Sequence, residues 1–368
     1  MCRQRQLIEI RRAMSDDQRY DVGTLINFAN SLFQVGGLDA PRAEVCARVL
    51  VEADVLGHVT HGLNLAGPYL RELEAGKMTA DGDHEVVRDK AAVAVWDGRY
   101  LPGLWLTQAA VEAATLKARD YGTGTIVIRR SHHIGCLASY LEVPARDGLV
   151  LEISCVDPSL AAVPAHGGLN AIFTPDPIAV GIPTGGDPIM IDLSASTTSM
   201  GTAALYRERG DKLPGAWLQD AEGTASNDPG VLVGDNPGTI LPTGGMDHGY
   251  KGFSLALILE TLTQGLSGLG RIDNPTNWGA SVQVRVTDPE CFCGVNEFRR
   301  QAAHLIDLCQ TSTPRDAANP VRLPGHSALA RKRQYVADGV PVAEGILSQL
   351  REWSGKLGVP MPEVEGRP

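Results

Sequence analysis

The spacing of apolar residues changes twice along this 368-residue chain, and this change limits the folds that it can adopt. Residues 20–78 show the recurrence of apolar positions that is typical of amphipathic helices. Residues 79–295 combine helical patterns with short apolar runs bounded by glycine and proline, which indicate strands, and residues 296–368 return to helix. We therefore predict a mixed α/β fold in which a domain of residues 79–295 is inserted into a discontinuous helical domain of residues 20–78 and 296–368. Residues 1–19 are expected to form an extension.

Charge and cysteine usage exclude several classes of protein. The net charge of −10 provides no basic face for nucleic acid, although it does not exclude a local site for a small anion. No apolar run approaches the ~18 residues of a membrane span, and the basic opening segment lacks the apolar core of a secretory signal. The seven cysteines form no CxxC motif, which suits a reducing compartment. We expect a cytoplasmic protein that binds neither nucleic acid nor a membrane.

Two adjacent histidines, His132 and His133, lie in the motif "RSHHIG", where an apolar strand pattern gives way to a helical one. Histidine changes charge near neutral pH, and such junctions commonly carry catalytic residues. The competing interpretation is that one ring caps the helix or packs in the core. The motif alone leaves both interpretations open.

A second pair, His58 and His61, lies in "LGHVTHGLN" at the end of a predicted helix. Histidines three positions apart share a helix face, so they could contact one metal ion. Zinc sites need three or four ligands, however, and no further cysteine or carboxylate lies at a suitable spacing. We therefore predict no metal site. The functional alternative is that His61, followed by Gly62, is a general acid/base.

Two further segments contain candidate binding residues. Asp192 ends the apolar strand of "IMIDLSAS", where a carboxylate followed by hydroxyls can orient a histidine or bind a ribose; a turn with a helix cap is the alternative. Lys251 lies in "GYKGFSL" before a long apolar helix, where glycine amides and a lysine could bind a pyrophosphate; a surface lysine in a turn is the alternative. The GxGxxG fingerprint of Rossmann folds is absent, so a dinucleotide would bind to a different fold.

The order of these motifs resembles one known family. The segments "THGLN", "SHHIG", "IDLSAS" and "GYKGFSL" are followed by "LPGH" and "ARKRQYVADGVPV" near the end of the chain. Together they resemble the malate/L-lactate dehydrogenase family of the non-Rossmann type, over nearly the whole chain from Tyr20 to Trp353. This family includes ureidoglycolate, sulfolactate and diketogulonate oxidoreductases and a cyclic-imine carboxylate reductase.

The resemblance implies a homodimeric NAD(P)-dependent oxidoreductase. It implies a largely antiparallel, non-Rossmann cofactor-binding sheet, with the discontinuous helical domain taking part in dimerisation. Members of the family transfer a hydride between the nicotinamide and C2 of a 2-hydroxy or 2-oxo acid. The choice between NAD and NADP stays open, as does the identity of the small-molecule substrate.

The resemblance also assigns site residues. His61 matches the family's catalytic histidine, and Asp192 matches the strand-end aspartate that pairs with it. His133, and not His132, matches the second family histidine; either His61 or His133 could be the proton donor. A histidine oriented by a carboxylate can exchange the proton that must accompany hydride transfer. The family's cofactor contacts map onto Asp192, Leu193, Ser194, Tyr250, Lys251, Pro324, Gly325 and His326.

Three positions depart from the family pattern. Thr60 replaces the usual serine before the catalytic histidine and keeps its hydroxyl. Leu65 replaces the arginine that would bind a substrate carboxylate bidentately. The usual "GTNP" turn reads "TPDP" at residues 174–177. Either the substrate lacks that carboxylate, or another cation binds it, such as Arg71, Arg129 or Arg130.

Two alternatives to a 2-oxo acid reductase follow from the same motifs. A cyclic imine carboxylate reductase would use the same hydride chemistry on a C=N bond. A protein that binds the cofactor without turnover belongs to a different class: the lost arginine favours it, and the presence of His61, His133 and Asp192 argues against it.

Overall fold

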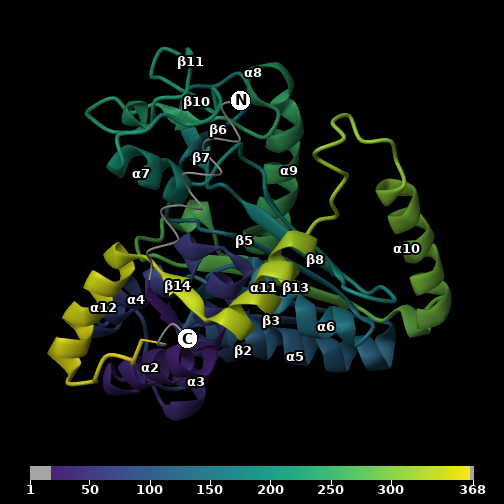
Figure 1. Ribbon diagram of the computed structural model, residues 1–368, viewed down its shortest axis with the longest axis horizontal. Coiled ribbons are helices and arrows are strands. Elements are labelled where there is room, and N and C mark those ends of the chain that lie inside the picture. The colour runs from purple at the N-terminus through teal and green to yellow at the C-terminus, as the bar shows by residue number, and fades with distance from the viewer. Residues whose placement is uncertain (1–17, 365–368) are drawn as a thin grey trace. The chain divides into compact units, whose positions relative to one another are not determined.

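The computed structural model describes residues 18–364, so the extension expected at residues 1–19 lies almost entirely outside the described residues. The chain forms two compact units (Figure 1). The first contains the residues up to Gly82 together with those from Gly325 onward, and the second contains residues 83–324. Each unit is described separately below.

The first unit is mainly helical. A short antiparallel pair joins its two chain segments: Arg19 of β1 (Gln18–Tyr20) lies opposite Pro341 of β14 (Val340–Val342). Its helices are α2 (Val22–Val35), α3 (Ala40–Leu56), α4 (Ala66–Glu74), α11 (His326–Asp338) and α12 (Glu344–Leu357).

Local sequence signals set the bounds of the first helices. The carboxylates of Asp21 and Asp39 accept hydrogen bonds from the first-turn amides of α2 and α3, at 2.8 and 2.9 Å. Helix α3 ends at Gly57, whose left-handed backbone (φ +90°) is the conformation that favours glycine after a helix. The apolar faces of these helices are buried, with Leu25, Leu32 and Leu50 fully inaccessible.

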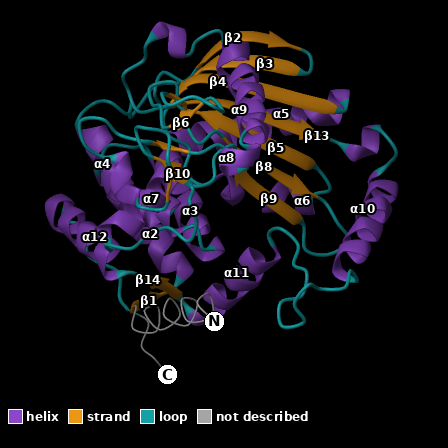
Figure 2. Cartoon of the chain, turned by 90° about the horizontal axis from the view of Figure 1, so that it is seen from above, coloured by secondary structure: helices purple, strands orange, loops and turns teal. Residues whose placement is uncertain are grey.

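A seven-stranded sheet forms the centre of the second unit (Figure 2). Its order is β2-β3-β4-β13-β5-β8-β9, and within the described chain every neighbouring pair is antiparallel except β3 and β4. The strands are β2 (Glu85–Lys90), β3 (Val93–Asp97), β4 (Thr123–Ser131), β13 (Ala280–Thr287), β5 (Val150–Val156), β8 (Pro177–Ile182) and β9 (Ile189–Ser194). The expected mixed fold with a largely antiparallel, non-Rossmann sheet is confirmed.

Helix α5 (Gly103–Tyr121) packs closely on this sheet. A Cβ atom at Gly124 of β4 would overlap the Ala114 carbonyl oxygen of the helix, so this approach needs a glycine. The sheet strands that the helix contacts, β4 and β13, contribute the fully buried Ile126, Ile128 and Val284 to the core.

A smaller strand-rich region lies at one end of the second unit. It contains the pair β6 (Val163–Pro164) and β7 (Ala171–Phe173), and a three-stranded sheet of β11 (Ala225–Ser226), β10 (Leu218–Gln219) and β12 (Thr239–Ile240). The remaining helices of this unit are α6 (Glu142–Arg146), α7 (Met200–Glu208), α8 (Gly245–His248), α9 (Tyr250–Glu260) and α10 (Val295–Gln310). A core of side chains including Phe173, Leu218 and Leu259 joins this region to α9. Among residues 18–364, no helix is both long and apolar enough to cross a membrane.

Candidate active site

His61 lies in a tight turn of the first unit, directly after α3. Two single 3₁₀ turns, Val59–His61 and Leu63–Leu65, connect α3 to α4 on either side of Gly62. The Thr60 hydroxyl lies 2.9 Å from Nδ1 of His61. Burial, and to a smaller extent the neighbouring His58, lower the pKa of His61, so its imidazole is neutral at pH 7.

The other predicted residues of the first unit lie on two elements. Leu65 is half-buried at the start of α4, and Arg71 is exposed in the last turn of that helix. Gly325 and His326 begin α11, where Gly325 has φ +86°. Helix α11 returns to α3: Nη1 of Arg331 donates a 2.7 Å hydrogen bond to the Leu56 carbonyl, at the end of the helix that precedes His61.

In the second unit, the register of the sheet places both histidines of "RSHHIG" beside Trp278. Ser131 pairs with Ala280, and because the two strands are antiparallel, the residues after Ser131 meet those before Ala280. The Trp278 ring lies 5.1 Å from the ring of His132 and 4.9 Å from that of His133. His132 is fully buried and His133 is half-buried. Burial lowers the pKa of His132 to about 3, so this ring does not gain a proton at physiological pH.

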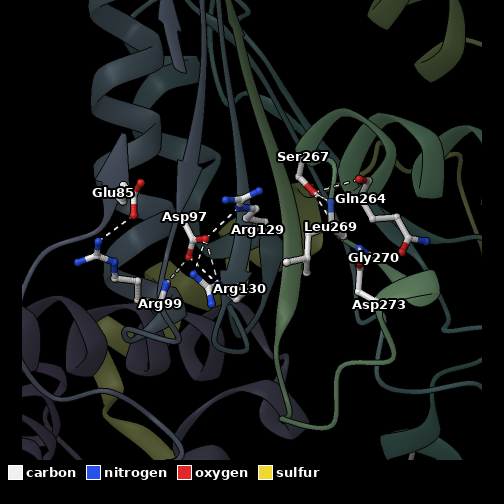
Figure 3. A network of polar contacts seen from close by, with 10 residues as sticks. All are labelled: Glu85, Asp97, Arg99, Arg129, Arg130, Gln264, Ser267, Leu269, Gly270 and Asp273. Atoms are coloured by element: carbon white, nitrogen blue, oxygen red, sulfur yellow. Dashed lines mark hydrogen bonds and ion pairs between the residues drawn. The ribbon is translucent and has the colours of Figure 1, made fainter. Parts of the chain in front are cut away.

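The strand end that leads into these histidines is fixed by the buried carboxylate of Asp97 (Figure 3). Asp97 accepts hydrogen bonds from the guanidinium groups of Arg129 (2.9 Å) and Arg130 (2.6 Å). Arg130 has φ +51°, and β4 has one extra residue relative to β13 at this point, which is a β-bulge. Burial raises the pKa of Asp97, but the hydrogen bonds from Arg130, from the Arg99 amide and from Arg129 together hold it below its usual value.

Asp192 lies on the edge strand β9 of the same unit. Its Oδ2 accepts a hydrogen bond from the Ala138 amide at 3.1 Å and lies 3.8 Å from Sγ of Cys136. Burial and the Asp192 carboxylate raise the pKa of Cys136, so the thiol stays protonated and acts as a donor. The predicted pairing of Asp192 with His61 joins residues of different units and stays a prediction.

The end of β9 and the start of α9 are joined through Thr243. Its hydroxyl donates to the Ser194 carbonyl (3.0 Å), its amide donates to the Ala195 carbonyl (2.7 Å), and its own carbonyl accepts from the Gly252 amide (3.0 Å). A Cβ atom at Gly252 would overlap the Ala195 oxygen and the Thr243 nitrogen. These contacts bring together two predicted segments that are distant in sequence: Leu193–Ser194 and Tyr250–Lys251. Pro324 contacts the same strand, because its carbonyl accepts from the Met190 amide at 3.2 Å.

The atypical "TPDP" turn places an acid in the core beneath the end of β9. Asp176 is fully buried with φ +47°, and its Oδ1 accepts a 2.5 Å hydrogen bond from the Thr174 hydroxyl. The backbone carbonyl of Asp176 accepts from the Ala195 amide at 3.1 Å. Burial, and next the neighbouring Glu260, raise the pKa of Asp176 to about 8. The carboxyl is therefore mostly protonated, and so uncharged, at pH 7.

Several residues near the predicted site were missed by the sequence analysis. Trp278 contacts both adjacent histidines, and Asp97 orients the arginines before them. His166 lies against Gly249, and its ring is 6.2 Å from that of Tyr250. These contacts are non-local, and a short stretch of sequence carries little signal for them; the Asp97–Gly98 pair at the end of an apolar strand is by itself typical of a turn.

Comparison with known proteins places the chain among the dehydrogenases of hydroxy acids. A family model described as malate/L-lactate dehydrogenase matches residues 20–351, and the chain belongs to this family. It is accordingly an oxidoreductase of the class that acts on CH–OH groups.

Individual relatives are similar over most of their length. A (2R)-3-sulfolactate dehydrogenase (NADP(+)) of Chromohalobacter salexigens is 35% identical over 86% of this chain and 92% of its own. The malate dehydrogenase structure from Entamoeba histolytica covers 95% of this chain and 100% of its own with a TM-score of 0.89; at 21% identity it shows the shared fold alone. A Δ1-piperideine-2-carboxylate reductase from Pseudomonas syringae pv. tomato is 27% identical, covers 91% of this chain and 99% of its own, and has a TM-score of 0.79.

The raised pKa of Asp176 leads to a prediction on stability. In the folded protein this carboxyl binds a proton up to about pH 8, whereas in the unfolded chain it loses the proton near pH 4. The free energy of unfolding therefore falls as pH rises between these values. Asp176→Asn has no carboxyl to lose a proton, so its free energy of unfolding should not fall with pH in this way. At pH 8.5 the variant should be more stable than the wild type by on the order of 1–3 kcal/mol, whereas at pH 4.5 the two should differ little. Chemical denaturation at both pH values measures it, with exposed Asp235→Asn as the control; equal differences at the two pH values would contradict it.

Proposed function

We propose that this protein is an NAD(P)-dependent oxidoreductase that transfers a hydride between the nicotinamide and C2 of a 2-hydroxy or 2-oxo acid. The observation that carries the proposal is the family match over residues 20–351, which includes His61, His133, Asp192 and Lys251 in the family's motifs. The Chromohalobacter relative carries sulfolactate and NADP in its name, which supports a 2-hydroxy acid substrate and favours NADP as the first cofactor to assay, with NAD beside it.

His61 is the proposed general acid/base. Its lowered pKa keeps the ring neutral at pH 7, which is the form that accepts a proton from a substrate hydroxyl during oxidation. The Thr60 hydroxyl at Nδ1 fixes the orientation of the ring and leaves proton exchange to Nε2. We assign Asp192 to the stabilisation of the protonated imidazole. His133, held against Trp278, is proposed to bind the substrate or the nicotinamide.

The residues around the start of α9 fit a dinucleotide phosphate. Lys251 supplies a cation in the first turn of this 11-residue helix, and no side chain caps the amides at its N-terminus. Because Gly252 has no side chain, the start of α9 can approach Ala195 more closely than a larger residue would allow. The Ser194 hydroxyl lies next to Ala195 along the chain. We propose that these residues bind the cofactor's phosphates and ribose, together with Asp192, Leu193, Tyr250 and the turn Pro324–His326. When bound, the nicotinamide supplies or accepts the hydride.

The side chain at position 65 is proposed to set substrate specificity. Leu65 cannot donate hydrogen bonds to a substrate carboxylate, and two of the alternative cations, Arg129 and Arg130, are already paired with Asp97. We infer that small 2-oxo acids such as pyruvate are weak substrates and that a bulkier carbonyl or imine compound is preferred. The similarity to Δ1-piperideine-2-carboxylate reductase supports reduction of a cyclic C=N bond as the second candidate activity.

A pair of variants tests the division between chemistry and cofactor binding. His61→Ala should lower kcat by about 10²- to 10⁴-fold, because a general acid/base is lost, and should leave cofactor affinity unchanged. Lys251→Ala should weaken cofactor binding instead, because a charge-assisted contact is lost. Absorbance of NAD(P)H with a panel of 2-oxo acids and cyclic imines measures turnover, and calorimetric titration measures affinity. Retained turnover in His61→Ala would move the proton transfer to His133, and no turnover by the wild type on any compound would favour cofactor binding alone.

Leu65→Arg should raise kcat/KM for pyruvate and oxaloacetate. A bidentate ion pair with the substrate carboxylate contributes on the order of 1.5–3 kcal/mol, which corresponds to about 10- to 150-fold. Leu65→Met is the matched control, because it keeps an apolar side chain of similar size. The proposal on specificity is wrong if the unmodified enzyme already turns over malate or lactate efficiently.

We further propose that the protein is a cytoplasmic homodimer. Helix α9 and its continuation through the π-helical segment Thr261–Gly265 expose apolar side chains, with Ile258 51% and Leu266 53% accessible, which is typical of a surface covered by a second copy. Analytical ultracentrifugation should give twice the chain mass of 39.2 kDa. Ile258→Glu should shift the protein toward monomer, whereas Leu116→Glu, at an exposed position of α5, should not. A monomeric wild type would contradict the proposal.

A further inference from the structure

The turn that carries His61 has few backbone hydrogen bonds of its own. The His61 amide donates to the His58 carbonyl at 2.8 Å, and the Leu65 amide donates to the Gly62 carbonyl at 2.9 Å. Two such 3₁₀ turns on either side of a glycine do not by themselves hold a side chain in one direction. The Thr60 hydroxyl orients the His61 ring within the turn, but the position of the turn itself depends on contacts from outside it.

One such contact comes from Asp54, in the last turn of α3. Asp54 is 5% exposed and lies on a face of apolar residues, and its Oδ2 accepts a hydrogen bond from the Leu63 amide at 2.8 Å. A buried carboxyl is costly unless it is hydrogen-bonded, so its presence in an otherwise apolar helix face needs a reason. The bond to Leu63 joins the end of α3 directly to the residue two positions after His61.

The same carboxyl determines the residue at position 62. A Cβ atom on Gly62 would overlap both carboxyl oxygens of Asp54 and the carbon between them. The backbone of Gly62 has φ −93°, so it is the space and not a left-handed conformation that requires glycine here. Asp54 and Gly62 thus form a close contact directly beneath the peptide that follows His61.

We propose that Asp54 is the positioning residue of His61: through its bond to Leu63 and its contact with Gly62, it fixes the turn that aims the imidazole. The inference rests on the proposed function, in which His61 exchanges the proton. Burial raises the pKa of Asp54 to about 7, against the lowering effect of the Leu63 hydrogen bond. Both forms of the carboxyl can accept that bond, so the positioning does not require the charge.

Three substitutions distinguish positioning from a purely structural role. Asp54→Ala should lower kcat by about 10- to 100-fold, because a shift of about 1 Å at a catalytic group has an effect of this size. Asp54→Asn keeps the size and an accepting oxygen and should restore kcat to within about threefold. The matched control is Asp39→Ala, which removes a carboxylate bonded to a backbone amide at the other end of α3 and should lower stability with kcat unchanged. Kinetics are followed with NADPH and 3-sulfopyruvate, or with the best compound of the panel.

A second readout needs neither cofactor nor turnover. The imidazole resonance of His61 in a ¹H–¹³C spectrum, assigned by its loss in His61→Ala, should move in Asp54→Ala and not in Asp39→Ala.

Gly62→Ala tests the contact between Asp54 and Gly62 from the other side and can be measured even if Asp54→Ala does not fold. Gly62→Ala alone should lower kcat. If Asp54→Ala is folded, adding Gly62→Ala to it should lower kcat less, because the shorter side chain at position 54 leaves room for the methyl group.

The outcomes separate this inference from the function on which it rests. If His61→Ala keeps full turnover, the proposed role of His61 is wrong. If His61→Ala is inactive but Asp54→Ala or Gly62→Ala keeps wild-type kcat, the positioning role of Asp54 is wrong while the proposed function stands. An Asp54→Asn variant as slow as Asp54→Ala would also overturn the positioning role of Asp54. In that case neither the hydrogen bond to Leu63 nor the size of the side chain at position 54 would position His61.

Discussion

Strand β13 is hydrogen-bonded along both edges, to β4 on one side and to β5 on the other, and the second unit depends on this double pairing. The pairing Ala280–Ser131 decides which residues meet beyond the strand ends, because the chain continues from both strands in opposite directions. It puts Trp278 against His132 and His133, and it leaves the extra residue of β4 to form the bulge at Arg130. A shift of register by one residue would turn every side chain of β13 to the other face of the sheet, and these contacts would be lost.

Burial shifts the pKa of several ionisable groups in each unit toward the uncharged form. Burial lowers the pKa of His61 and of His132 and raises the pKa of Asp54 and of Asp176, so each group is shifted toward its uncharged form for the same physical reason. Asp97 is the exception, because two arginines keep it ionised. Neutral groups in fixed positions provide hydrogen bonds without the desolvation cost of a charge.

Much of the fold could be predicted from the sequence because its longer elements have a local signal. The apolar spacing of α2, α3 and α5 and the capping residues Asp21 and Asp39 are sufficient to locate the first helices. Strand β2 could not be predicted, since all six of its residues are exposed and show no alternation, and β1 and β14 have only three residues each. The motifs indicated which residues to examine at the site. The contacts of Trp278, Asp97 and Asp54 depend on the register of a sheet or the end of a helix, and no short stretch of sequence records them.

The first unit is built from both halves of a divided sequence, and this has a consequence for biosynthesis. Residues 83–324 are contiguous, so they can fold as they leave the ribosome. Strand β1 must wait for β14, whose residues are translated more than 300 positions later, and the end of α3 acquires its contact with Arg331 at the same late stage. The segment that carries His61 is therefore among the first to be synthesised and among the last to be completed. A chain that stops before α11 would contain every residue of the inserted sheet and still lack the support of this histidine.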